Sequence, residues 1–377
     1  MSVVGQQAAA SSPEVGSPEL GSPEVGSLGV GPIEAAADGS SSVEDSHDLG
    51  DESVNFRVEV VLRHLDNPCG LIARPTRSKE GPYDLFLAES GAGRVLHVST
   101  ASPNDYRPVI SGFPTNDFNK RLAFRIGPLG LAFLTPRSKL IVGDSGQPNG
   151  NDLVSVYTLP ADGEVLDATK PDHSAGPLRN RPGTDAGNVN FLSMAKSGEM
   201  VYVSVGGDDD QGVILKAGIE SDRLAYLKPL PTNASTSGGA PGGIAMIPPP
   251  RPTFLVVSQI GSFETPGDSS LTFYGPATGE KAMSLPTGLH DMVSLAYSPS
   301  GQLYTADFAW AEENAGGVYR LDDVRRAGKQ GCRAVRIASI TRPMALAFTS
   351  DGTLWVTAFG SGMNTKQGQL LKITGDL

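Results

Sequence analysis

The feature that most constrains the fold is a two-run segment that recurs six times between residues 69 and 358. Its last copy, PMALAFTSDGTLWVTA at residues 343–358, has two alternating apolar runs joined by a Ser-Asp-Gly turn. This pattern predicts a β-hairpin, because side chains alternate between the two faces of a strand. Successive copies are 51 to 61 residues apart, which indicates a repeat architecture. The first core apolar residues of the copies are Leu71, Leu131, Leu192, Ile244, Leu295 and Leu346.

Each copy continues with a third alternating run and usually a weaker fourth one. The pattern therefore predicts four antiparallel strands per repeat, and it has almost no helical periodicity. Six such repeats predict an all-β, six-bladed propeller. The third runs cover residues 93–100, 152–159, 212–219, 270–277, 316–323 and 368–375.

The sixth copy ends directly after its third strand, whereas residues 54–65 form a strand pattern with no partner of their own. Folded sheets avoid an unpaired edge. We therefore expect residues 54–65 to supply the outermost strand of the C-terminal blade and to close the ring, which makes residues 54–377 one domain.

Residues 1–53 differ from the rest in composition. They repeat GSPEV-like units and hold ten of the 41 acidic residues but no Lys or Arg. Gly, Ser, Pro and Glu supply too little apolar area to offset the entropy of ordering, so we predict a disordered acidic tail. The 31 remaining acidic residues nearly balance the 30 basic ones, and without a basic stripe nucleic-acid binding is not expected.

No run of about 18 apolar residues predicts a membrane span, and the first residues lack the pattern of a secretory signal. We therefore expect a cytoplasmic protein. We also expect it to be a monomer. The two cysteines, Cys69 and Cys332, lie far apart and have no metal-binding spacing around them, so buried thiols are the simpler interpretation.

Several motifs resemble one family of propellers. They are GLAF and LIVGDSG at residues 130–133 and 140–146, DLFLAESGAGRVLHV at 84–98 and ALAFTSDGTLWVTAFG at 345–360. Together they are similar to the NHL-repeat and gluconolactonase-like six-bladed propellers. This resemblance implies a fold shared by lactonases, sugar dehydrogenases, strictosidine synthase-like proteins and plain binding scaffolds, so it constrains function weakly.

Loop lengths predict which face carries the site. We call the face with the loops between second and third strands, and with the links between blades, the top face. Its loops are long, as is the connection at residues 164–188, whereas the hairpin turns on the other face are short. A ligand is expected at the top face and the channel mouth.

In the gluconolactonase-like group, Asn and Asp at the channel rim bind a catalytic divalent cation together with a Glu. Only Asn190 matches the strict rim position here, and Asn67, Asp291 and Arg342 lie one position earlier. The other strict positions hold Cys69, Leu129, Gly242, Val293 and Met344. A hard cation needs several oxygen ligands, which this ring does not supply. A Ca²⁺ or other divalent cation on loop residues stays open, with Asp208 and Asp210 as candidates against the simpler interpretation of a solvated turn.

Other polar residues are candidates for ligand contact or chemistry. His290 and Asp291 are adjacent at a channel entrance, where a histidine beside a carboxylate can act as a general base. Asp144 and Asp307 end second strands, where turn-forming acceptors of backbone N–H groups are the simpler interpretation. Trp310 suits a contact with a sugar or a protein, and Arg342 suits an anionic ligand.

Two hypotheses follow. The first is a propeller that binds a small molecule or a protein partner at its top face. The second is a divergent enzyme of the lactonase or sugar-dehydrogenase type that uses His290, Asp291, Asn67 and Asn190. The sequence favours the first, because the family's metal positions are largely lost.

Overall fold

The protein is an all-β six-bladed propeller. The computed structural model describes residues 49–118, 124–135, 138–148, 151–161, 163–177, 190–206, 212–230, 239–250, 253–326, 328–361 and 366–377. In these ranges the regular elements are strands and three short 3-10 helices. The helices are η1 (Ser53–Asn55), η2 (Pro103–Asp105) and η3 (Glu313–Ala315). No helix in the described ranges is long and apolar enough to cross a membrane.

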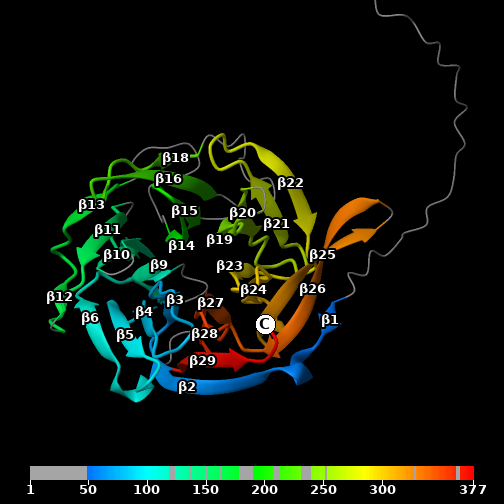
Figure 1. Cartoon of the computed structure of the whole chain (residues 1–377), viewed down its shortest axis with the longest axis horizontal. Coiled ribbons are helices and arrows are strands. Elements are labelled where there is room, and N and C mark those ends of the chain that lie inside the picture. Colours follow the sequence, from blue (N-terminus) through cyan, green and yellow to red (C-terminus); the bar gives the residue numbers. More distant parts are fainter. Residues whose placement is uncertain are drawn as a thin grey trace, which may run out of the picture. The chain divides into compact units, whose positions relative to one another are not determined.

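Six sheets surround a central channel, and each sheet is one blade (Figure 1). From the channel outward, the first three blades have these strands. Blade one has β3 (Pro68–Ala73), β4 (Asp84–Glu89), β5 (Arg94–Ser99) and β6 (Arg107–Ser111). Blade two has β9 (Pro128–Thr135), β10 (Lys139–Asp144), β11 (Leu153–Thr158) and β13 (His173–Ala175). Blade three has β14 (Asn190–Ser197), β15 (Met200–Gly206) and β16 (Gly212–Glu220), with the short strands β17 (Arg223–Leu224) and β18 (Lys228–Pro229) both paired to β16.

The last three blades follow the same order. Blade four has β19 (Pro241–Met246), β20 (Leu255–Gln259), β21 (Ser270–Tyr274) and β22 (Lys281–Pro286). Blade five has β23 (Met292–Tyr297), β24 (Leu303–Asp307), β25 (Gly317–Arg326) and β26 (Lys329–Ser339). Blade six has β27 (Pro343–Phe348), β28 (Leu354–Ala358), β29 (Gly368–Thr374) and β2 (Arg57–Leu65).

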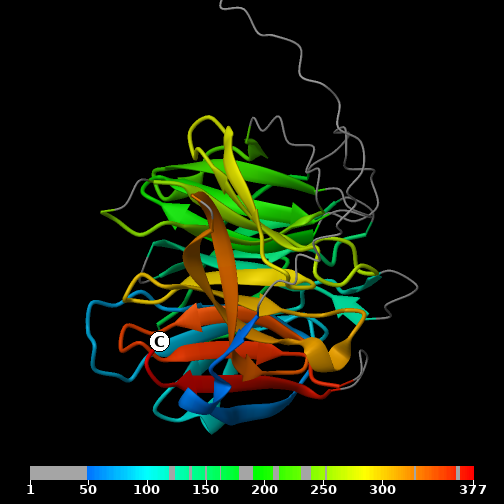
Figure 2. The same cartoon turned by 90° about the vertical axis from the view of Figure 1, so that its right-hand side faces the viewer.

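The outermost strand of blade six comes from the N-terminal side of the chain. β2 pairs antiparallel with β29, as the unpaired pattern at residues 54–65 predicted, and its first paired residue is Arg57. The innermost strands β27 and β3 are neighbours, so the contacts run around the ring without a break. The side view in Figure 2 shows β2 beside β29 at the same level of the ring.

Three short strands lie where the sequence predicted none. β1 (Gly50–Asp51) pairs parallel with β26, so two residues assigned to the predicted tail extend blade five. β12 (Leu166–Asp167) pairs parallel with β6 of blade one. β13 lies in the connection at residues 164–188, which we expected to be a top-face loop, and it completes blade two instead. The predicted tail up to residue 48 and residues 178–189 lie outside the described ranges.

The hydrophobic core is divided among the interfaces between neighbouring blades. One buried cluster fills each interface, with Trp355 and Leu85 between blades six and one and Tyr274 and Tyr202 between blades three and four. Alternate residues of the inner strands supply these side chains, as expected for strands buried on both faces. The blades are thus held by apolar packing, and the top face is free to carry polar groups.

Each innermost strand carries a register shift near its top end. In blade four, the Ser258 hydroxyl accepts the N–H of Gly243 at 2.7 Å and donates to the carbonyl of Met292, in the next blade, at 2.7 Å. Ser204 and Thr357 act in the same way in blades three and six. A hydroxyl on the second strand therefore closes the bulge and ties one blade to the next, which places the top ends of the inner strands.

An additional hairpin lies between blades one and two. It consists of β7 (Asn116–Phe118) and β8 (Phe124–Ile126). The N–H of Gly127, directly after it, donates to the Ser90 hydroxyl at 2.7 Å, and the Asn67 amide donates to the Arg125 carbonyl at 3.4 Å. These contacts hold the hairpin at the top face, beside the channel mouth.

Candidate functional site at the channel mouth

Asp307 organises the polar residues at the top of blade five. It ends β24 and is fully buried, and its two carboxylate oxygens accept the N–H groups of His290 at 3.0 Å and Asp291 at 2.6 Å. Glu89 accepts the N–H of Asp66 at 2.8 Å in the same way in blade one. Carboxylates at this position thus accept hydrogen bonds from backbone N–H groups of the link that leads into the innermost strand. This agrees with the simpler interpretation of Asp307 as a turn-forming acceptor.

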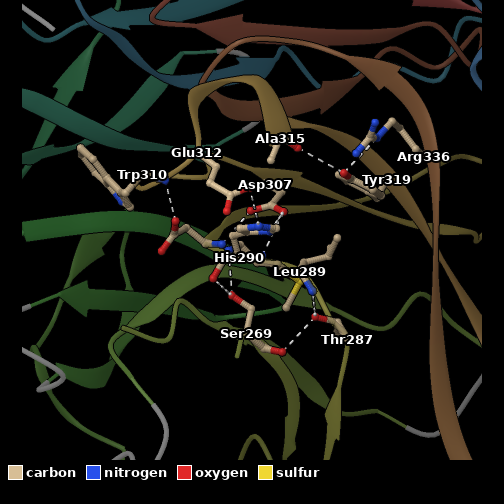
Figure 3. Close-up of polar contacts among 12 residues, drawn as sticks. Ser269, Thr287, Leu289, His290, Asp307, Trp310, Glu312, Ala315, Tyr319 and Arg336 are labelled. Atoms are coloured by element: carbon tan, nitrogen blue, oxygen red, sulfur yellow. Dashed lines mark hydrogen bonds and ion pairs between the residues drawn. The ribbon is translucent and has the colours of Figure 1, made fainter. Parts of the chain in front are cut away.

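The imidazole of His290 lies between two carboxylates (Figure 3). Its Nδ1 is 3.6 Å from Asp307 Oδ2, and its Nε2 is 3.8 Å from Glu312 Oε2. The contact with Asp307 raises the pKa of His290, with smaller contributions from Glu312 and Asp291, and partial burial opposes this increase. The position of the ring favours a charged imidazolium, because both ring nitrogens face negative charge.

Asp291, the next residue, is 2 % exposed. Its Oδ2 accepts the N–H of Trp310 at 2.7 Å, whereas its Oδ1 has no hydrogen-bond partner among the described residues. Burial raises the pKa of Asp291 to about 7, Asp307 adds to the increase, and the N–H of Trp310 and the charge of His290 oppose it. Asp291 can therefore gain or lose a proton near neutral pH.

The loop after β24 brings these groups together. It turns through Ala309, which has a φ of 52°, and leads to Trp310, Glu312 and η3. The Tyr319 hydroxyl donates to the carbonyl of Ala315 at 3.3 Å and accepts from Arg336 Nε at 3.0 Å, which fixes the end of the loop on blade five (Figure 3).

Aromatic side chains close the other part of the mouth. The ring of Trp310 lies 4.2 Å from that of Phe308, 5.1 Å from that of Phe263 and 5.5 Å from that of Phe124, measured between centroids. Phe359 of blade six contacts both Phe124 and Phe308. Phe124 belongs to β8, so the β7–β8 hairpin reaches residues of blades five and six across the mouth. We call these five residues the aromatic cluster.

Several buried polar atoms around the mouth lack hydrogen-bond partners among the described residues. On blades two, three and four they are Asp144 Oδ1, Asn190 Oδ1 and Gln259 Oε1, each at the top end of a strand. On blade five they are His290 Nδ1, Asp291 Oδ1 and Trp310 Nε1. Buried polar atoms are nearly always paired in folded proteins, so these atoms at the top ends of blades two to five indicate places for a polar ligand group or ordered water.

The remaining predicted residues are distributed around the ring. Asn67 is buried, and its side-chain amide donates a hydrogen bond to the β7–β8 hairpin. Asp144 accepts from Gln147 Nε2 at 2.6 Å, and burial raises its pKa. Arg342 is half-buried with a φ of 51°, in the link from blade five to blade six. The structure thus brings His290, Asp291, Asp307 and Trp310 together, whereas Asn67, Asn190, Asp144 and Arg342 lie on other blades. Asp208 and Asp210 lie outside the described residues.

Sequence reasoning missed Gln259, Phe124 and Phe359. Gln259 ends its second strand at the position that Asp144 and Asp307 occupy in their blades, so the repeat alignment contained its signal. Phe124 and Phe359 gave no such signal, because their contacts with blade five depend on how the hairpin and blade six are placed.

The rim does not fit a divalent cation. Apolar residues occupy four of its strict positions, and the described residues contain no group of three or more His, Cys, Asp or Glu that could hold a metal ion. The donor set is therefore unlike the oxygen-rich site that the family resemblance implies, and no step below depends on a metal.

No family model matches the chain, and no curated protein matches its sequence significantly. Among solved structures it is similar to a glucose dehydrogenase, at 14% identity and a TM-score of 0.56 over 85% of this chain and 100% of that chain. It is also similar to a PQQ-bound aldose sugar dehydrogenase from Streptomyces coelicolor, at 16% identity and a TM-score of 0.54 over 85% and 98% of the two chains. A gluconolactonase from Xanthomonas campestris matches at 13% identity and a TM-score of 0.51 over 85% and 90%. These similarities support the broad propeller class; assignment to the NHL repeats stays a prediction.

Proposed function

We propose that the protein binds a small hydroxyl-bearing molecule, such as a sugar or a sugar lactone, at the channel mouth beside the β7–β8 hairpin. One observation carries the proposal: among the described residues, buried polar atoms without hydrogen-bond partners occur at the top ends of blades two to five, and those of blade five include the indole N–H of Trp310 in the aromatic cluster. An unpaired buried acceptor costs about 1–3 kcal/mol. A ligand that pairs several of them at once gains that free energy on binding.

The chemistry of the unpaired atoms favours hydroxyl groups. Four are oxygens, on Asp144, Asn190, Gln259 and Asp291, and they need hydrogen-bond donors. The indole N–H of Trp310 is a donor and needs an acceptor. A hydroxyl group can serve as both, and the apolar face of a sugar ring packs on aromatic side chains. Mixed apolar and polar surroundings of this kind are typical of small-molecule sites.

The similar structures add support by analogy. Two are named as sugar dehydrogenases and one as a gluconolactonase, which makes sugars and their lactones the first molecules to test. Fold similarity at this identity does not transfer an activity. A protein ligand, a cytoplasmic location and a monomeric state stay predictions from the sequence.

A second candidate function is catalysis of proton transfer at the same mouth. It is favoured by Asp291, because a carboxyl group with a pKa of about 7 is matched to general acid or base work near neutral pH. His290, held between two carboxylates, is less available as a base, because its raised pKa favours the form that already carries the proton. In this alternative Asp291 accepts a proton from a bound hydroxyl group or water, and His290 supplies positive charge beside it.

Titration calorimetry of the full chain with aldoses and aldonolactones tests the proposal. Asn190→Leu removes one unpaired acceptor, so we expect weaker ligand binding together with an unchanged or higher Tm, because an unsatisfied buried group is lost. Asn104→Leu, at an exposed position of η2, is a control with the same substitution, and its affinity should stay at the wild-type value. The absence of saturable binding of any such compound to the wild-type protein would refute the proposal. Turnover of a bound lactone, lost in Asp291→Asn, would favour the enzyme.

A further inference from the structure

A second polar pocket lies between blades five and six, outside the channel mouth. Its volume is about 560 Å³. Its walls come from β2, β29, the link between β26 and β27, and the loop after β28; Figure 1 shows β2 on the outer side of β29. The polar side chains that line it include Arg63, His64, Ser339, Thr341, Gln367 and Gln369.

A bulge in β2 presents the two basic residues to this pocket. Leu62 pairs with Leu370 and Leu65 with Gly368, so β2 has one residue more than β29 between the two pairs. His64, inside the bulge, has a φ of 64°, a left-handed conformation that is unfavourable for a residue other than Gly. Bulges redirect side chains and are frequent beside functional sites, and here Arg63 and His64 both line the pocket.

The charge of the pocket is positive. No Asp or Glu is among the described residues that line it. In the described part of the chain neither Arg63 nor His64 forms an ion pair. The hydroxyl and amide groups of Thr341 and Gln369 add neutral hydrogen-bond donors at the same place. An exposed arginine with no carboxylate partner is available to bind an anion.

We propose that this pocket binds a small organic phosphate, with Arg63 as the main contact of the phosphate group. The planar guanidinium group matches a tetrahedral oxyanion through two parallel hydrogen bonds. The volume falls in the range of small-molecule sites and exceeds the need of a bare phosphate ion. The site is separate from the channel mouth and extends the function proposed above.

Calorimetry at low ionic strength tests this site with glucose 6-phosphate and inorganic phosphate as probes and glucose as the uncharged comparison. We expect saturable binding of glucose 6-phosphate that weakens as salt is added. Arg63→Gln should weaken it about ten- to 100-fold, the effect of losing a charge-assisted contact. Arg57→Gln removes an exposed arginine of the same strand that does not line the pocket, and its affinity should match the wild type.

Arg63→Lys keeps the charge but not the planar fork, so intermediate affinity is expected. This variant also provides the test if Arg63→Gln does not fold. Inorganic phosphate carries no sugar ring for the channel mouth, so Asp291→Asn should bind it as the wild type does, which separates this site from the proposed function. Equal losses in Arg63→Gln and Arg57→Gln, or no saturable binding of glucose 6-phosphate to the wild type, would overturn the proposal.

Discussion

The buried carboxyl group of Asp291 makes the stability of the protein depend on pH. The isosteric substitution Asp291→Asn should remove this dependence. The pKa of Asp291 is about 7 in the folded protein, against an ordinary value of 3.8. Each pKa unit corresponds to ~1.4 kcal/mol. Ionising this group in the folded protein therefore costs about 4 kcal/mol more than in the unfolded chain.

The sign follows from the order of the two pKa values. Below about pH 4 both states hold the proton, so the group costs nothing. Between about pH 4 and pH 7 only the unfolded chain releases it, and the free energy of unfolding falls by ~1.4 kcal/mol per pH unit. Above about pH 7 both states are ionised, and the loss stays near its full value.

Asp291→Asn removes this titration and keeps an oxygen for the N–H of Trp310. We expect the variant to gain stability relative to the wild type as pH rises from about 4 to 8, by about 4 kcal/mol in total. Urea unfolding at a series of pH values measures this difference. Asp376→Asn, at an exposed position near the C terminus, is the control and should follow the wild-type curve. A difference between Asp291→Asn and wild type that is the same at pH 4 and pH 8 would refute the reasoning.

Three further changes test the surroundings of the site. Ser258→Ala leaves the N–H of Gly243 and a carbonyl of blade five unpaired, so chemical unfolding should show a loss of about 1–3 kcal/mol, whereas Ser102→Ala, at an exposed position whose hydroxyl caps no helix, should show almost none. Phe124→Ala removes the hairpin's aromatic contacts, and a cost of ~3 kcal/mol predicts about 100-fold faster hydrogen exchange in the described strands β7 and β8; unchanged exchange there would contradict this packing. Glu52→Gln breaks a partly exposed ion pair with Arg320, so it should cost less than about 1 kcal/mol in urea unfolding; a larger loss would mean that β1 is essential to blade five.

The blades could be predicted because their signals are local. Alternation, turn residues and the repeat period identify strands one to three of every blade without knowledge of tertiary contacts, and the unpaired pattern at residues 54–65 identified the partner of β29. The short strands β1, β12 and β13 have two or three residues each, too few for alternation to appear. Their pairing is decided by the edges of blades five, one and two.

The site could be predicted only in part for the same reason. His290 and Asp291 were recognised as neighbours in sequence, and they lie in the link directly before β23. Their surroundings are created by the loop after β24. This loop places Glu312 beside His290 and the N–H of Trp310 beside Asp291. Such contacts between a loop and a link have no sequence period, so no pattern could indicate them.

Burial at the mouth also determines how a ligand reaches it. Asn190 and Asp291 are 3 % and 2 % exposed, and Phe359 is 1 % exposed, so a ligand that pairs with them must displace something first. We expect the described strands of the β7–β8 hairpin to move, because the aromatic contacts of Phe124 connect them to blades five and six. Weakening that contact in Phe124→Ala should raise the association rate of a mouth ligand more than it changes the rate at the second pocket. Equal rates for wild type and variant, measured by stopped-flow tryptophan fluorescence, would place the entry elsewhere on the ring.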